Sequence, residues 1–170
     1  GLFRRWARLM GDAERWLGDP RLQSDADRGE HSAEILARMR DEDVRTVALE
    51  VSSHALEQHR VDGTWFAAAC FTNLSQDHLD YHGSMASYFE AKARLFDPTR
   101  TAAAAVNVDD GKGIEIARRA SDAGLPVLTF AGSDERLSTR VDVVAEDVEL
   151  SGSGTRFVLA TRRTGERAAV

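Results

Sequence analysis

Residues 47–96 read VALEVSSHALEQHRVDGTWFAAACFTNLSQDHLDYHGSMASYFEAKARLF, and this stretch decides the fold that we expect. It contains two short apolar runs, 47–51 and 66–71, and each leads directly into a polar cluster. A continuous apolar run of this length is typical of a parallel strand that is buried on both faces. In open α/β sheets, ligands bind just outside the carboxyl ends of the strands. We therefore predict buried strands at 44–51 and 66–72, with a functional site where they end.

Helices and further strands alternate on both sides of these two runs. Ser32 and Ser84 each precede a stretch with helical spacing, and serine is a favoured residue at helix N-caps. Besides the two strands above, the predicted elements are helices at 33–40, 85–96 and 111–123 and strands at 102–108 and 127–130. This alternation predicts an α/β fold with a mostly parallel sheet and flanking helices.

Both ends of the chain differ from this pattern. Residues 141–150 and 155–161 alternate apolar and polar side chains on either side of Ser-Gly-Ser-Gly, and 167–170 can add a third strand. We expect a small C-terminal antiparallel sheet there. Residues 2–17 show the spacing of an amphipathic helix, which Gly-Asp-Pro would end.

The composition is that of an ordinary globular protein. The 170 residues are 42% hydrophobic and 29% charged, and the formal net charge is −6, so no basic field is present to attract nucleic acid. The single cysteine, Cys70, excludes a disulfide scaffold; it is expected in the core, and the protein in the cytoplasm. No apolar run approaches the roughly 18 residues that cross a bilayer, so we expect no membrane insertion.

Candidate site residues gather where the two apolar runs end. Glu50 lies inside an apolar run, and a buried carboxylate needs a metal ion, a partner or backbone N–H donors. From spacing alone, Mg²⁺ binding and backbone hydrogen bonding are equally good explanations. Ser52 follows at a turn, where it can bind a ligand or satisfy its own backbone. Arg60 can clamp a carboxylate or phosphate, or it can be an ordinary solvated arginine.

The second polar cluster holds two histidines and precedes a lysine. His78 and His82 are four residues apart, but 73–83 resembles a loop, so this spacing does not define a zinc motif. Lys92 lies in the predicted helix 85–96. A partly buried lysine can become reactive, although a surface lysine is the simpler interpretation.

Three motifs in order resemble the Mur ligases, most closely the MurE branch. They are EVSSHAL through RVDG from Glu50, FTNLSQDHLDYHG from Phe71 and YFEAKARLF from Tyr88. The resemblance covers 31–170 and implies part of the central, ATP-binding domain of that family. It implies ligation of a diamino acid, either meso-diaminopimelate or L-lysine, to UDP-MurNAc-L-Ala-D-Glu in peptidoglycan synthesis.

The resemblance also assigns roles to individual residues. It makes Glu50 and His78 ligands of Mg²⁺, and Lys92 a carbamylated lysine that binds a second Mg²⁺. It places Ser52 and Arg60 at the UDP-MurNAc-dipeptide, and Asn73 near ATP and the metal.

The chain departs from the family pattern at several places. It contains no Gly-x-x-Gly-Lys-Thr phosphate loop, and residues 1–30 match nothing in the family. The N-terminal and C-terminal ligase domains are expected to be missing, so we predict a truncated central domain without turnover of its own. The alternatives are another branch of the superfamily, of MurF or folylpolyglutamate synthase type, and a non-catalytic remnant that binds Mg²⁺ or a UDP-sugar. A metal-dependent hydrolase is the alternative outside the family.

Overall fold

The computed structural model describes residues 28–75, 82–132, 141–152, 154–162 and 164–170, with the backbone alone for 28–33. The predicted helix at 2–17 lies outside these residues. The chain forms two compact units, Gly1–Gly63 and Thr64–Val170, which we call the N-terminal and C-terminal units. No described helix is long and apolar enough to span a bilayer.

The N-terminal unit contains two described helices, α2 (Arg28–Asp41) and α3 (Ser53–Glu57). The prediction of a helix around 33–40 is confirmed, but α2 starts earlier, so Ser32 lies inside it rather than at its cap. Ser52 caps α3, because its Oγ accepts a hydrogen bond from the backbone N–H of Ala55 at 3.1 Å.

The predicted strand at 44–51 is wrong. These residues form neither helix nor strand, and the side chains of Val47 and Leu49 are exposed, as is Glu50. An apolar run becomes a strand only when a neighbour completes its backbone hydrogen bonds. No described segment pairs with residues 44–51.

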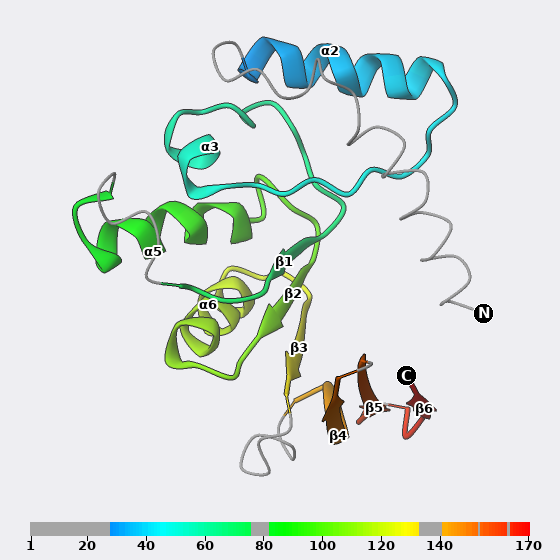
Figure 1. Ribbon diagram of the computed structural model, residues 1–170. Coiled ribbons are helices and arrows are strands. Elements are labelled where there is room, and N and C mark those ends of the chain that lie inside the picture. Colours follow the sequence, from blue (N-terminus) through cyan, green and yellow to red (C-terminus); the bar gives the residue numbers. More distant parts are fainter. Residues whose placement is uncertain (1–27, 76–81, 133–140, 153, 163) are drawn as a thin grey trace. The chain divides into compact units, whose positions relative to one another are not determined.

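The C-terminal unit is built on a six-stranded sheet in the order β1-β2-β3-β4-β5-β6 (Figure 1). The strands are β1 (Ala69–Phe71), β2 (Ala104–Asn107), β3 (Val127–Ala131), β4 (Val143–Ser151), β5 (Gly154–Thr161) and β6 (Arg167–Ala169). Neighbouring strands from β1 to β4 are parallel, and β4, β5 and β6 are antiparallel. The predicted α/β class is therefore confirmed. The predicted C-terminal antiparallel strands are also confirmed, and they are added to the parallel strands at β4.

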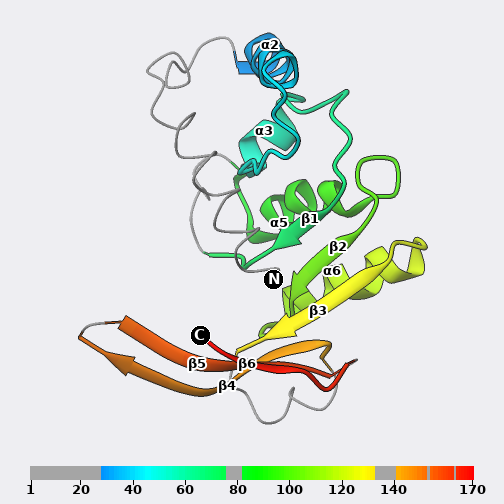
Figure 2. The ribbon, with the colours of Figure 1, turned by 90° about the vertical axis from the view of Figure 1, so that its right-hand side faces the viewer.

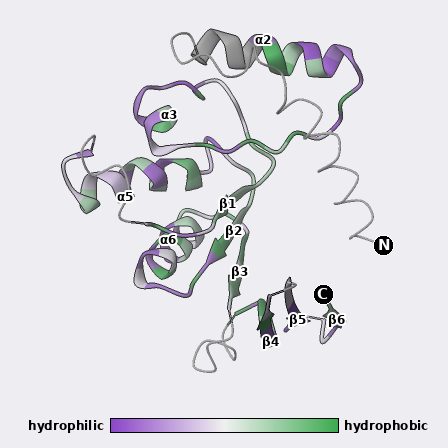
Figure 3. Cartoon of the chain, in the orientation of Figure 1, coloured by the Kyte–Doolittle hydropathy of each residue, from purple (hydrophilic) through white to green (hydrophobic). Residues whose placement is uncertain are grey.

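Two helices, α5 (Met85–Ala93) and α6 (Gly111–Asp122), lie on the same side of β1–β3 in Figures 1 and 2. A 3₁₀ turn, η2 (Arg94–Phe96), continues α5. Ser84 caps α5 as predicted, accepting a hydrogen bond from the Ser87 N–H. The core between helices and sheet consists of apolar side chains from both layers, among them Phe71, Tyr88, Phe89, Leu95, Phe96, Val106 and Ile116. Figure 3 shows that hydrophobic residues predominate in β1–β3.

The prediction that Cys70 is a core residue is also wrong. Ala69 and Phe71 are buried, but Cys70 between them is exposed, so it is not a core residue. In a strand, alternate side chains point to opposite faces, and α5 and α6 cover only one of them. Partial desolvation of the thiol still raises the pKa of Cys70 above its ordinary value.

Candidate functional site

The carboxyl ends of β2 and β3 are joined by an aspartate. The Gly132 backbone N–H, just after β3, donates to both carboxylate oxygens of Asp109 at 2.9 and 3.1 Å. The Asn107 side-chain oxygen in turn accepts the Asp109 N–H at 2.9 Å. The role of Asp109 was not predicted, although the polar run Asn-Val-Asp-Asp after an apolar strand was a usable signal.

The next residue, Asp110, caps α6. Its Oδ1 accepts the backbone N–H groups of Lys112 at 2.7 Å and of Gly113 at 2.8 Å. Asp109 and Asp110 thus use their carboxylates to hold the loop between β2 and α6.

Lys92 lies in the last turn of α5 and is half-buried. Its Nζ is 5.4 Å from the ring centroid of Tyr88, one turn earlier on the same helix. The Tyr88 ring is buried, and it also stacks on the ring of His82, with 5.2 Å between centroids. Lys92 therefore rests on an aromatic surface, which stabilises an ammonium group.

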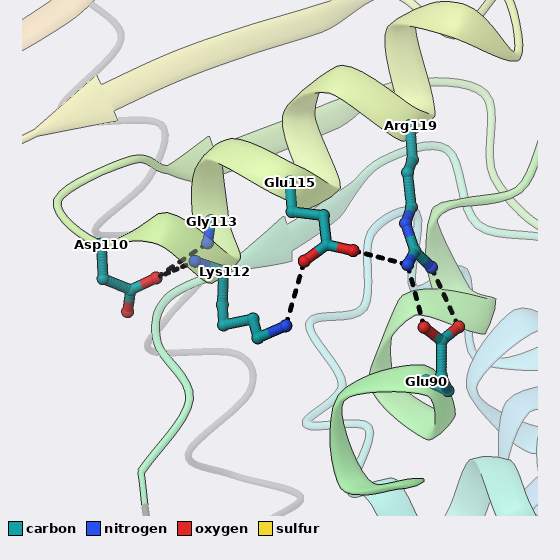
Figure 4. A network of polar contacts seen from close by, with 6 residues as sticks. All are labelled: Glu90, Asp110, Lys112, Gly113, Glu115 and Arg119. Carbon is teal, nitrogen blue, oxygen red and sulfur yellow. Dashed lines mark hydrogen bonds and ion pairs between the residues drawn. The ribbon is translucent and has the colours of Figure 1, made fainter. Parts of the chain in front are cut away.

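Four charged residues link α5 to α6, and we call them the helix clamp: Glu90, Lys112, Glu115 and Arg119 (Figure 4). The Arg119 guanidinium donates to both carboxylate oxygens of Glu90 at 2.9 Å and to Glu115 at 2.5 Å. Lys112 donates to the other Glu115 oxygen at 3.0 Å. The hydrogen bonds from Arg119 lower the pKa of Glu90, and those from Lys112 and then Arg119 lower the pKa of Glu115.

These lowered pKa values predict acid sensitivity of the helix clamp. Below the ordinary glutamate pKa of 4.5 the unfolded chain takes up protons before the folded one does. The stabilisation is therefore complete at neutral pH and is lost as the pH falls through the lowered pKa values. In urea unfolding at about pH 6 and about pH 3, we expect wild type to lose more stability than Arg119→Met, whose glutamates lack this partner. Equal losses in both proteins would contradict the prediction.

The N-terminal unit carries three of the predicted site residues. Glu50 is exposed, so the expectation of a buried carboxylate is wrong, and it forms no hydrogen bond with the described residues. Ser52 uses its Oγ to cap α3, which confirms the turn interpretation for this atom. Arg60 is half-buried in the turn after α3, where its backbone N–H donates to the Ala55 carbonyl at 2.8 Å.

The other predicted residues belong to the C-terminal unit. Asn73 is exposed two residues after β1, and Lys92 lies on α5 as described. His78 lies outside the described residues. Within the described ranges, no three His, Cys, Asp or Glu side chains form a cluster that could hold a metal ion. The candidate residues thus form two groups, one in each unit.

Comparison with known proteins identifies the family of the chain. The Mur ligase middle domain family matches residues 31–169. A UDP-N-acetylmuramoyl-L-alanyl-D-glutamate–2,6-diaminopimelate ligase from Xanthomonas oryzae is 47% identical over 125 residues, covering 74% of this chain and 24% of the relative. The enzyme of the same name from Streptomyces avermitilis is 39% identical over 153 residues, covering 89% of this chain and 29% of the relative.

A solved structure of a ligase with that name has the same fold. It superposes with a TM-score of 0.62 at 35% identity, over 72% of this chain and 24% of the solved one. The chain thus spans about a quarter of the length of the relatives that it matches. The family match covers most of the chain and agrees with the mixed six-stranded sheet. This chain therefore belongs to the Mur ligase family, and residues 31–169 correspond to its middle domain.

Proposed function

We propose that this chain is the middle-domain part of an ATP-dependent ligase that joins 2,6-diaminopimelate to UDP-MurNAc-L-Ala-D-Glu. The observation that carries the proposal is the 47% identity to a ligase of that name over 125 residues. In the proposed reaction, a substrate carboxylate attacks the γ-phosphorus of ATP and ADP leaves. The amine of diaminopimelate then attacks the acyl phosphate, phosphate leaves and the amine loses a proton.

We propose different binding roles for the candidate residues of the two groups. Arg60 provides a bidentate donor for a carboxylate or phosphate of the UDP-MurNAc-dipeptide, and Ser52 contacts the same substrate. We assign Asn73, two residues after β1, to the region of ATP and the metal, because ligands of open α/β sheets bind outside the carboxyl ends of the strands. Both steps gather negative charge on phosphate and acyl oxygens, so cationic groups are needed beside them.

Mg²⁺ suits the donors that these residues offer. It prefers oxygen ligands, and the exposed Glu50 carboxylate engages no described residue. Neutral Lys92 would react with CO₂ and release a proton, and the resulting carbamate would offer two further oxygens. We propose Glu50 and His78 as ligands of one Mg²⁺, and carbamylated Lys92 as a ligand of a second Mg²⁺. When bound, Mg²⁺ would neutralise the charge of the phosphoryl group being transferred.

Replacing Lys92 tests the function and the carbamate together. A chimaera is made in which residues 31–169 of this chain replace the matching segment of the Xanthomonas oryzae ligase. Formation of the product that contains diaminopimelate is then measured. We expect the chimaera to be active, and Lys92→Arg and Lys92→Ala each to lose about 100-fold or more. Arginine keeps the positive charge but cannot form the carbamate, so both variants should fail alike.

The matched control is Arg118→Ala, because Arg118 is an exposed residue of α6 that pairs with Asp122 on the same helix. It should leave the rate unchanged. The isolated 170-residue chain should release no phosphate from ATP, since it contains no Gly-x-x-Gly-Lys-Thr loop. An active chimaera whose Lys92→Arg variant keeps full activity would refute the carbamate, and an inactive wild-type chimaera would refute the function.

A further inference from the structure

The helix clamp contacts α5 through Glu90, on the side of the helix opposite to Lys92. Successive residues of an α-helix are about 100° apart, so Glu90 lies about 200° around the axis from Tyr88, and Lys92 lies about 40° from Tyr88. The structure agrees with this geometry, since Lys92 Nζ lies over the Tyr88 ring whereas Glu90 reaches across to α6. The clamp and Lys92 therefore occupy opposite faces of one short helix.

Arg119 is itself held from three directions. Its guanidinium forms a two-pronged contact with Glu90 and a further hydrogen bond with Glu115. Its Cζ also lies 5.2 Å from the ring centroid of Phe89, a fully buried residue of α5. The planar Arg119 guanidinium has partners on both helices, Glu90 on α5 and Glu115 on α6. Two parallel hydrogen bonds to Glu90 resist rotation of α5 about its axis, whereas a single hydrogen bond would allow it.

We propose that Arg119 is a positioning residue that fixes the rotation of α5 and thereby the position of Lys92 Nζ. Since Nζ lies roughly 8 Å from the helix axis, a rotation of about 10° would move it by about 1.4 Å. A displacement of about 1 Å at a reacting group can lower a rate by about 100-fold. The assignment of a catalytic purpose to this position depends on the function proposed above.

The rotation of α5 can be measured in the chain itself. Cys70 is the single cysteine and is exposed, so a nitroxide spin label can be attached to it. Its paramagnetic effect on the Lys92 side-chain protons depends steeply on distance. We expect Arg119→Lys, which keeps the charge but loses the fork, to change this effect by about 1.5-fold, in line with a shift of about 1 Å. Glu90→Gln should change it in the same direction.

The matched control is Arg118→Lys, because Arg118 lies next to Arg119 on α6 but pairs with Asp122 of the same helix. It should leave the paramagnetic effect unchanged. In the chimaera we expect Arg119→Lys to lower kcat about 100-fold with KM values unchanged, because position and not substrate binding is altered. Arg118→Lys should keep both constants.

The two measurements separate the possible failures. An unchanged paramagnetic effect in both Arg119→Lys and Glu90→Gln would overturn the proposal. So would a changed effect combined with unaltered kcat in an active chimaera. If the wild-type chimaera is inactive, the proposed function fails, and the spin-label result alone decides whether Arg119 sets the rotation of α5.

Discussion

Gly113→Ala is expected to destabilise the C-terminal unit by about 3 kcal/mol or more. A Cβ on Gly113 would lie 1.8 Å from the backbone carbonyl oxygen of Asn107 and 2.9 Å from its carbon. Such a clash with backbone atoms cannot be relieved by rotating a side chain, so α6 must move away from the end of β2. Urea unfolding followed by circular dichroism would measure the loss.

The sequence offers a matched control two residues earlier. Gly111 begins α6, and a Cβ there would meet no atom within 4 Å. Gly111→Ala should therefore change the free energy of unfolding by less than about 0.5 kcal/mol. Equal stability of the two variants would show that α6 does not approach Asn107 as closely as the structure has it.

Phe89→Ala is expected to cost about 3–5 kcal/mol of folding free energy. Phe89 is 1% exposed and fills the space between α5 and α6. The Lys112 Nζ lies 4.1 Å and the Arg119 Cζ 5.2 Å from its ring centroid. Truncation would leave a cavity and would also remove the aromatic surface on which both cations rest.

Phe89→Leu separates these two contributions. Leucine fills much of the space without an aromatic face, so we expect a loss of less than about 2 kcal/mol. The same denaturation experiment would measure both variants. If Phe89→Leu is as damaging as Phe89→Ala, the ring contacts rather than the volume carry most of the stabilisation; if neither variant is destabilised, the described core is wrong.

Several elements could be predicted because their signals are local. Ser84 caps α5, and Gly124 takes a φ of +87° after α6, as expected of a glycine that ends a helix. The alternating residues 143–151 and 154–161 form the β4–β5 hairpin. In each case the side chains of one short segment suffice to select its backbone conformation.

The failed predictions concern burial and pairing. Residues 44–51 have the composition of a buried strand, but a strand is stable only beside another one. Cys70 has apolar neighbours in sequence, yet its exposure depends on whether a second layer covers that face of the sheet. The burial of Glu50 is predicted from its apolar neighbours in sequence, and it fails because the predicted strand at 44–51 does not form.

The amino-acid sequence by itself determined the α/β class, the family and the polar clusters at Glu50, Asn73 and Lys92. Periodicity, capping residues and ordered motifs act over a few residues, so they can be read without coordinates. The tertiary structure alone decided that Asp109 joins the ends of β2 and β3 and that Arg119 grips Glu90, 29 residues away. Such contacts depend on the packing of α6 against α5 and on the register of the sheet, which arise only when distant segments bury their apolar surfaces together.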